Sequence, residues 1–265
     1  MTTSSPTPSS PLEVQVVEWH RPLQWLGLAW RDIERSPLIG AAHGLLLAVA
    51  GAILLYGFRH QFWWLAGICS AFMLVAPLLA CGLYEVSRQL SLGMTPSWSS
   101  ALHVWLTGDR RLIGLGFLMG LSCAGWVISS AALIYGYTPA DIVTPQDFLR
   151  HVVLQPHFGL FEIWLLMGAL LSAPMFASVV IAIPLLLDRP IGLWQAVHTS
   201  WRVVAHNPGA MAFWAFLLTF FTLLGLASAL LGLLIVVPLL AHASWYAYRD
   251  LLLPPPGAAM DDHHE

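Results

Sequence analysis

Six apolar segments, each long enough to cross a lipid bilayer as a helix, dominate this chain of 265 residues. A spanning helix needs ~20 apolar residues to traverse ~30 Å of hydrocarbon. The segments cover residues 38–58, 62–84, 112–137, 161–187, 208–227 and 229–248. Only 9% of the residues are charged, against roughly 25% in a soluble domain. The sequence therefore predicts an all-α membrane protein whose six transmembrane helices form three hairpins.

A short phrase recurs close to the ends of the even-numbered segments. Full copies of Pro-Leu-Leu-Ala begin at Pro77 and Pro238, and in both an arginine follows the proline by eleven residues. A shorter copy begins at Pro184. The phrase divides a membrane domain of residues 19–252 into repeat units of about 22–90, 95–187 and 190–252. Residues 1–18 and 253–265 are expected to be disordered tails, the first of them rich in Ser, Thr and Pro.

Each unit is expected to open with an amphipathic helix that lies on the membrane surface. The clearest covers residues 191–205, where Trp194 and Trp201 fall on one apolar stripe at 100° per residue. Thr199 is among the polar residues expected to face away from that stripe. The two tryptophans are predicted interfacial anchors, because indole rings favour the boundary between lipid and water.

Two further segments show a similar pattern. Residues 96–106 place Trp98 and Trp105 on one face, and these are again predicted anchors. Residues 22–35 form a less regular stripe, from which Trp25 strays. That stripe consists of Leu23, Leu26, Trp30 and Ile33. Three interfacial helices, one before each hairpin, are therefore expected.

Arginine supplies every basic side chain of this chain, and its distribution sets the expected orientation. Cytoplasmic loops carry an excess of positive charge. In a six-span arrangement Arg59 and Arg150 lie on one side, and all the other arginines lie on the opposite side. Those others are Arg21, Arg31, Arg35, Arg88, Arg110, Arg111, Arg189, Arg202 and Arg249. We therefore expect a multi-pass membrane protein with both termini cytoplasmic, its span ends anchored by Glu85, Arg88 and Arg249.

Pro77, Pro184 and Pro238 are expected to lie inside spanning helices. There a proline removes a backbone donor and frees a carbonyl, which in lipid needs a partner from a neighbouring helix or from water. Two interpretations stay open. A static kink is favoured, because kinks at proline are an ordinary feature of helices. The alternative is a hinge or a cavity in the cytoplasmic third of the bundle.

Local motifs predict how some helices pack. Gly40 with Gly44, and Gly116 with Gly120, are G-x-x-x-G pairs, which allow helix backbones to approach closely in lipid. Packing within the chain is favoured over a dimer seam. In the long loop between the third and fourth segments, Thr144-Pro145-Gln146-Asp147 resembles a capping box and predicts a short helix.

His43 and His242 are the two histidines that fall inside predicted spans, both near the cytoplasmic boundary. Axial imidazoles can hold a haem iron, so one hypothesis is a bis-histidine haem site. The favoured alternative is that each imidazole bonds to a carbonyl or a hydroxyl between helices. The sequence holds no C-x-x-C-H motif and no C-x-x-C pair. No metal site is predicted, and haem stays the only candidate cofactor.

The sequence also argues against several classes of function. It has no Gly-rich phosphate loop, no G-x-S-x-G and no H-E-x-x-H. The formal net charge of -3 and the lack of a basic cluster give no sign of nucleic-acid binding. The central parts of the six segments hold no Asp, Glu or Arg, whereas ion-coupled carriers usually place ionisable groups there. We therefore expect neither an enzyme nor an ion-coupled transporter.

Four blocks of sequence resemble one family of membrane proteins. They are residues 22–32 (PLQWLGLAWRD), 82–88 (GLYEVSR), 184–189 (PLLLDR) and 238–250 (PLLAHASWYAYRD). With these blocks in this order, the chain from about residue 19 to 252 resembles the predicted integral membrane proteins called domain of unknown function 2189. The resemblance implies a bacterial inner-membrane protein without an established activity. Some members carry a cytochrome c oxidase label, which two histidines cannot support for a haem and copper centre.

Three functions are weighed on this basis. The preferred one is a non-catalytic accessory, assembly or envelope component, with the lipid bilayer and other membrane proteins such as respiratory complexes as partners. An alternative is a transporter or channel for a weakly polar or lipid-like molecule, using a cavity beside the three prolines. A second alternative is a haem-binding accessory protein of a respiratory complex.

Overall fold

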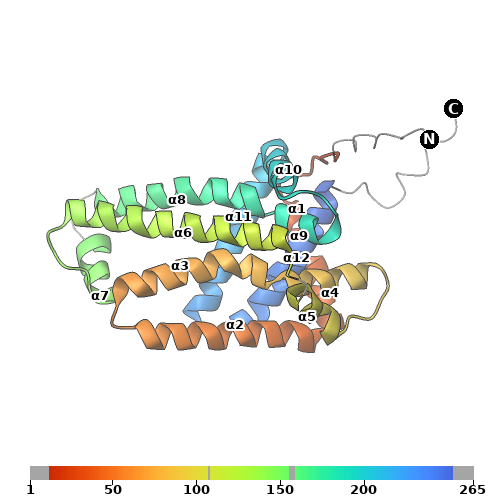
Figure 1. Ribbon diagram of the computed structural model, residues 1–265, viewed down its shortest axis with the longest axis horizontal. Coiled ribbons are helices and arrows are strands. Elements are labelled where there is room, and N and C mark those ends of the chain that lie inside the picture. Colours follow the sequence, from red (N-terminus) through yellow and green to blue (C-terminus); the bar gives the residue numbers. More distant parts are fainter. Residues whose placement is uncertain (1–11, 107, 155–158, 253–265) are drawn as a thin grey trace, which may run out of the picture.

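The computed structural model describes residues 12–106, 108–154 and 159–252, and this part of the chain is built of helices and their connections (Figure 1). The helices are α1 (Arg21–Arg35), α2 (Pro37–Phe58), α3 (Phe62–Leu79), α4 (Cys81–Ser91), α5 (Trp98–Leu106), α6 (Arg110–Tyr137), α7 (Pro145–Phe148), η1 (Leu149–Val153), α8 (Leu160–Val179), α9 (Ala182–Asp188), α10 (Leu193–His206), α11 (Pro208–Ala227) and α12 (Leu233–Leu252). Of the predicted tails, residues 1–11 and 253–265 lie outside the described residues. The all-helical class is confirmed.

Four helical segments are long and apolar enough to cross a membrane. They are Pro37–Phe58, Arg110–Tyr137, Leu160–Asp188 and Pro208–Ala227, with mean hydropathy between 1.8 and 2.3. Within the described side chains, α3 contributes the shorter apolar helix Phe62–Phe72. The second half of α12 carries His242, Tyr246 and Arg249, which lower its hydropathy. The structure thus supports four candidate spans, and the six spans in three hairpins stay a prediction.

The long helices share one direction, and the short ones collect at one end. In Figure 1, α2, α3, α6 and α8 run lengthwise, while α1, α4, α5, α9 and α10 gather at the right. We call these five short helices and the second half of α12, residues 242–252, the end layer. Among the described contacts of α1, those with α12 are the most extensive. Six of the eleven arginines belong to the end layer, Arg189 joins α9 to α10, and Arg110 and Arg111 are the first two residues of α6.

Helix α1 shows two distinct faces. Its residues Pro22, Trp25, Ala29 and Asp32, spaced three or four apart, are buried against the bundle. Of the predicted apolar stripe, Leu23 and Trp30 are exposed, whereas Leu26 and Ile33 are half-buried. Trp25 deviates from that stripe because it belongs to the buried face, where its indole packs edge-on against Trp214 at 5.6 Å between ring centroids.

Helix α10 departs from its predicted pattern in one respect. Trp194 and Trp201 are exposed as expected, but Thr199, which was predicted to lie on the polar face, is buried. The reason lies in the neighbouring Ser200, whose buried hydroxyl accepts a hydrogen bond of 3.2 Å from the backbone N–H of Ile181. This N–H stands at the break between α8 and α9, so α10 must press its small polar face against that break.

Residues 12–18 had been assigned to the N-terminal tail, yet they are held against the end layer. Asn207 accepts the Val17 N–H at 2.8 Å and donates to the Gln15 carbonyl at 3.0 Å. The Gln15 N–H donates to the carbonyl of Leu251 at 2.9 Å. Hydrogen bonds to Asn207, between α10 and α11, and to Leu251, near the end of α12, therefore fix this segment.

Two connections follow the sequence motifs closely. The predicted capping box is present, because the Thr144 hydroxyl accepts from the Asp147 N–H while the Asp147 carboxylate accepts from the Thr144 N–H. The turn between α11 and α12 is tight, and its residues Ala229 and Leu230 have φ values of 52° and 70°. The Ser228 hydroxyl stabilises this turn by accepting the Gly232 N–H at 2.7 Å.

Candidate functional site

A buried hydrogen-bonded network joins three helices of the end layer. The carboxylate of Asp32 in α1 accepts hydrogen bonds from Ser87 of α4 at 2.8 Å and from Tyr246 of α12 at 3.0 Å. The Ser87 hydroxyl lies 2.7 Å from Nδ1 of His242. Asp32, Ser87 and His242 are each 0% exposed. Polar groups so deeply buried are costly unless paired, and here they pair with one another.

The network fixes how His242 carries its proton. A serine hydroxyl has one hydrogen, and Ser87 gives it to Asp32. His242 must therefore donate from Nδ1, which leaves a bare Nε2; this Nε2 is buried without a hydrogen-bond partner among the described atoms. The pKa of Asp32 is raised because burial disfavours the carboxylate, although the bonds from Ser87 and Tyr246 and the charge of Arg35 oppose that shift.

His43 lies in the same region but has its own partner. Its Nδ1 donates to the Ile39 carbonyl at 2.8 Å. Its Nε2 is enclosed by α4 and α5, since a methyl group added to Gly82 would lie 2.9 Å from both this nitrogen and the Ala101 carbonyl. A haem iron would have to occupy that crowded position, so the geometry does not favour the haem hypothesis. Among the described residues, no group of three or more metal-ligating side chains comes together.

An apolar cavity of about 250 Å³ lies inside the helix bundle. For comparison, a cavity of ~150 Å³ can hold benzene. Four side chains bring hydroxyl groups to a wall that is otherwise apolar: Tyr84, Thr219, Thr222 and Ser244. The apolar side chains include Leu47, Phe72, Phe176, Val180, Leu218, Val236 and Leu240. The cavity can therefore accept an apolar ligand that carries one weakly polar group.

The three prolines of the recurring phrase take different positions around this cavity. Pro77 lines it directly, just before the break between α3 and α4. Pro238 lies inside the continuous helix α12, and the preceding Val237 lines the cavity. Pro184 is buried in the first turn of α9 and is not among the lining residues. The three copies of the phrase therefore differ in backbone structure. A further proline, Pro174, lies inside α8 and was not singled out from the sequence.

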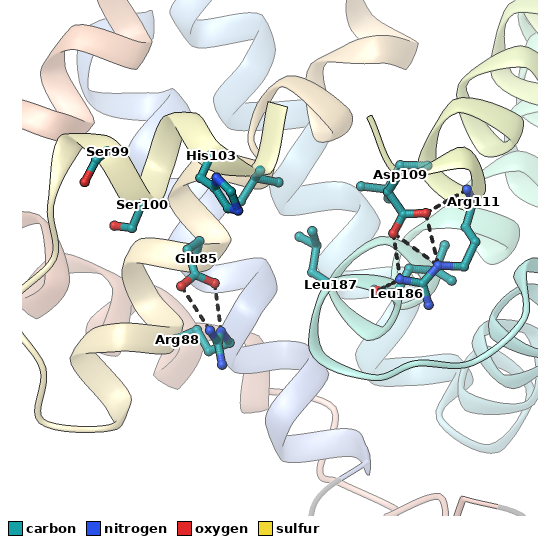
Figure 2. Close-up of a pocket in the computed structure, with 11 residues that line it drawn as sticks. Glu85, Arg88, Ser99, Ser100, His103, Asp109, Arg111, Leu186 and Leu187 are labelled. Carbon is teal, nitrogen blue, oxygen red and sulfur yellow. Dashed lines mark hydrogen bonds and ion pairs between the residues drawn. The ribbon is translucent and has the colours of Figure 1, made fainter. Parts of the chain in front are cut away.

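A second cavity, of about 460 Å³, opens in the end layer, and seven of its eleven lining residues are polar or charged. We call it the polar pocket. It lies between α4, α5, the start of α6 and α9 (Figure 2). Its polar lining residues are Glu85, Arg88, Ser99, Ser100, His103, Asp109 and Arg111. Two arginine–carboxylate pairs face each other across it, and they differ in what else they bind.

The guanidinium of Arg111 binds groups at the start of α6 and at the end of α9. Its guanidinium bonds to Asp109 at 2.6 Å and donates to the carbonyls of Leu186, Arg189 and Ile191 at 2.9 to 3.0 Å. The last carbonyls of a helix lack partners within it, so Arg111 satisfies the end of α9. Asp109 in turn caps α6 by accepting the Arg111 N–H at 2.8 Å. The guanidinium beside it holds the pKa of Asp109 below its ordinary value.

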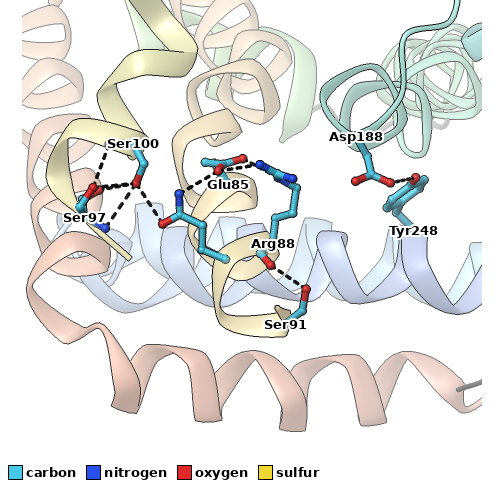
Figure 3. Close-up of polar contacts among 8 residues, drawn as sticks. Glu85, Arg88, Ser91, Ser97, Ser100, Asp188 and Tyr248 are labelled. Carbon is cyan, nitrogen blue, oxygen red and sulfur yellow. Dashed lines mark hydrogen bonds and ion pairs between the residues drawn. The ribbon is translucent and has the colours of Figure 1, made fainter. Parts of the chain in front are cut away.

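Arg88 is bound within its own helix. It makes two bonds to Glu85, of 2.7 and 3.0 Å, three residues earlier in α4. Gln89 also donates to Glu85, at 2.9 Å, and accepts from Ser100 of α5 at 3.1 Å (Figure 3). Across the gap Asp188 accepts a bond of 2.6 Å from the Tyr248 hydroxyl. The Glu85–Arg88 pair therefore does not itself connect two helices.

The remaining predicted anchors lie on the surface of the end layer. Trp98, Trp105, Trp194 and Trp201 are 47%, 41%, 70% and 45% exposed. Arg249 is half-buried, near Tyr246. These positions suit contact with a lipid interface, and the anchoring itself stays a prediction.

Several residues of these sites were not identified from the sequence. Asp32, Ser87 and Tyr246 lie in three separate helices, and only the fold brings them together. One signal was available in the sequence: Asp32 follows Trp25 by two helical turns, so both lie on the face of the first amphipathic segment that deviates from the apolar stripe. Asp109 and Arg111 had been interpreted only as a polar break before a span.

One comparison with known proteins gives a match. Residues 65–188 match the family model described as predicted integral membrane protein (DUF2189). This confirms the resemblance inferred from the sequence, and the matched region contains two of its four blocks, residues 82–88 and 184–189. No curated protein and no solved structure matches the chain.

Proposed function

We propose that this integral membrane protein is a non-catalytic component that holds one lipid-like molecule in the apolar cavity. The observation that carries the proposal is the cavity itself, about 250 Å³ in volume. Ligand sites in proteins are mostly apolar, with a few placed polar groups. Here Tyr84, Thr219, Thr222 and Ser244 provide those groups. An acyl or isoprenoid chain with a hydroxyl or carbonyl group has matching chemistry.

The position of the cavity supports access from the bilayer. Its walls come from α3, α8 and α11 as well as α2, α4 and α12. In a bacterial inner membrane with both termini cytoplasmic, it would lie below the end layer and beside the inner leaflet. Reporter fusions that place the two termini on opposite sides of the membrane would contradict this orientation.

Filling the cavity tests the proposal. We expect Thr222→Trp to lower the amount of co-purifying lipid-like molecule by roughly tenfold, because a large ring would occupy the ligand's space. Lipid extraction and mass spectrometry of the purified protein measure this amount. The matched control is Leu223→Trp, since Leu223 is 54% exposed on the same helix. Equal retention in both variants, or no bound molecule in the wild type, would overturn the proposal.

A second candidate is transport of such a molecule rather than storage. Pro77 at the cavity wall, beside the break between α3 and α4, favours it, because hinges are found at the ends of helices, where residues can absorb a change in backbone angles. Flux in proteoliposomes separates the two functions. Transport through a moving kink predicts a lower flux for Pro77→Ala, and an unchanged flux would leave the kink a static feature.

An accessory role beside another membrane complex is compatible with ligand binding. The exposed tryptophans of α5 and α10 would then rest on the leaflet or on a partner. Mild detergent extraction followed by mass spectrometry identifies such partners, and recovery of an isolated monomer would count against this role.

A further inference from the structure

The two ion pairs of the polar pocket are not equally available to a ligand. Arg111 uses its donors on Asp109 and on three backbone carbonyls, so replacing a partner would disrupt the end of α9. Among the described side-chain contacts, the guanidinium of Arg88 binds Glu85 alone, through two hydrogen bonds within one turn of α4. An intrahelical pair of this kind contributes little to stability. Glu85 and Arg88 can therefore exchange partners at low cost.

The opposite wall of the pocket belongs to an amphipathic helix. Ser99 and His103 of α5 line the pocket. Trp98 and Trp105 of the same helix are exposed, and we expect them to lie at the surface of the membrane. The pocket therefore stands next to the level at which lipid head groups are found.

Charge decides which kind of ligand suits this pocket. Glu85, Arg88, Asp109 and Arg111 sum to no net charge. A purely anionic ligand on Arg88 would separate Glu85, whose side chain is 15% exposed, from its cation, and a purely cationic ligand would separate Arg88 from its anion. Either ligand would replace only one side of two charge-assisted hydrogen bonds. A ligand with both charges replaces both partners at once.

We propose that the polar pocket binds a zwitterionic phosphate ester of a primary amine, such as the head group of phosphatidylethanolamine. The phosphate accepts hydrogen bonds from the planar fork of Arg88, a geometry that suits phosphate oxygens. The ammonium takes the place of Arg88 beside Glu85. His103 and Ser99 offer further donors to the phosphate from the opposite wall. A volume of about 460 Å³ falls within the roughly 300–1,000 Å³ of small-molecule sites.

Native mass spectrometry of the full-length protein in detergent, titrated with defined phospholipids, tests this site. We expect phosphatidylethanolamine to bind about tenfold more tightly than phosphatidylglycerol, which has the phosphate but no amine. Arg88→Gln should weaken phosphatidylethanolamine binding by about tenfold, the effect of one charge-assisted hydrogen bond. Arg88→Lys should retain part of the affinity. Glu85→Gln should remove the preference for the amine.

The matched control is Arg110→Gln, which removes the same charge. Arg110 is exposed and adjoins the pocket without lining it. Equal losses in Arg88→Gln and Arg110→Gln would overturn the proposal, as would equal binding of the two lipids by the wild type. Displacement of the lipid by glycerophosphoethanolamine at similar concentration would assign the site to a soluble zwitterion, and its failure to displace would assign the site to the membrane lipid. Thr222→Trp leaves this preference unchanged, so the outcome is independent of the apolar cavity.

Discussion

The two ends of this molecule bury their side chains in different ways. In the end layer, Asp32 of α1, Ser87 of α4 and His242 of α12 are completely buried. Along the long helices the surface is far more open: only 17% of the apolar window of α6 is buried inside the protein, and 33% of that of α2. The comparison shows that the two regions have different solvents. The long helices leave much of their apolar surface to lipid, whereas the end layer must provide its own core.

This difference has a physical origin. Apolar association gains little inside a bilayer, because lipid tails are as apolar as the side chains. Helices there depend on shape and on close backbone approach. In the end layer, buried polar groups require specific partners, since an unpaired one costs free energy. Specific hydrogen bonds should therefore set stability at one end, and steric fit should set it along the spans.

The strongest test of this contrast is to remove the acceptor at the centre of the buried network. Asp32→Ala takes the acceptor from Ser87 and Tyr246. We expect a loss of about 2–4 kcal/mol in the free energy of unfolding, because at least one buried donor is left unpaired. Reversible unfolding in mixed micelles measures this loss. A loss below 0.5 kcal/mol, roughly that of an ordinary surface substitution, would show that the network is not a determinant of stability.

A conservative variant serves as the control. Because the pKa of Asp32 is raised above its ordinary value of 3.8, the folded protein binds this proton more tightly than the unfolded chain. The wild type should therefore lose stability as pH rises from 3.8 through the raised pKa, and Asp32→Asn should not show this pH-dependent loss.

In Asp32→Ala, Ser87 is free to donate to His242, so nitrogen NMR should report a shift of the His242 proton from Nδ1 to Nε2.

The long helices could be predicted from the sequence and the buried network could not, and one physical reason explains both outcomes. Hydropathy and helical period are properties of neighbouring residues, so the segments that became α2, α6, α8 and α11 were evident. The end layer depends on pairs such as Asp32 with Ser87, which lie 55 positions apart. Nothing in local periodicity indicates which distant polar residues will meet. Glu85 and Arg88 lie within one helical turn, but the sequence predicted them as interfacial anchors and not as an ion pair.

The polar pocket offers a comparison within the end layer itself. Arg111→Gln removes a bond to Asp109 and three bonds that connect α6 to the end of α9 and the residues after it, and we expect a cost of about 2–3 kcal/mol. Arg88→Gln breaks a pair confined to α4 and should cost under ~1 kcal/mol. Unfolding of both variants under the same micelle conditions gives the two losses in the free energy of unfolding. If these losses were equal, Arg88 would also stabilise the fold, and the conclusion that Arg111 alone connects helices here would be wrong.

The last test concerns the region along the spans, where steric fit should dominate. A methyl group added to Gly44 would lie 2.6 Å from the Leu233 carbonyl oxygen and from the Leu234 Cα, both backbone atoms of α12. We expect Gly44→Ala to destabilise the protein by about 1–3 kcal/mol, because the two helices would have to separate. Gly120 is a matched control in α6, with nothing within 4 Å of an added methyl group. Gly120→Ala should leave stability unchanged or raise it, since alanine favours helix over glycine. Equal effects of the two substitutions would mean that helix propensity, rather than the contact between α2 and α12, determines stability in this region.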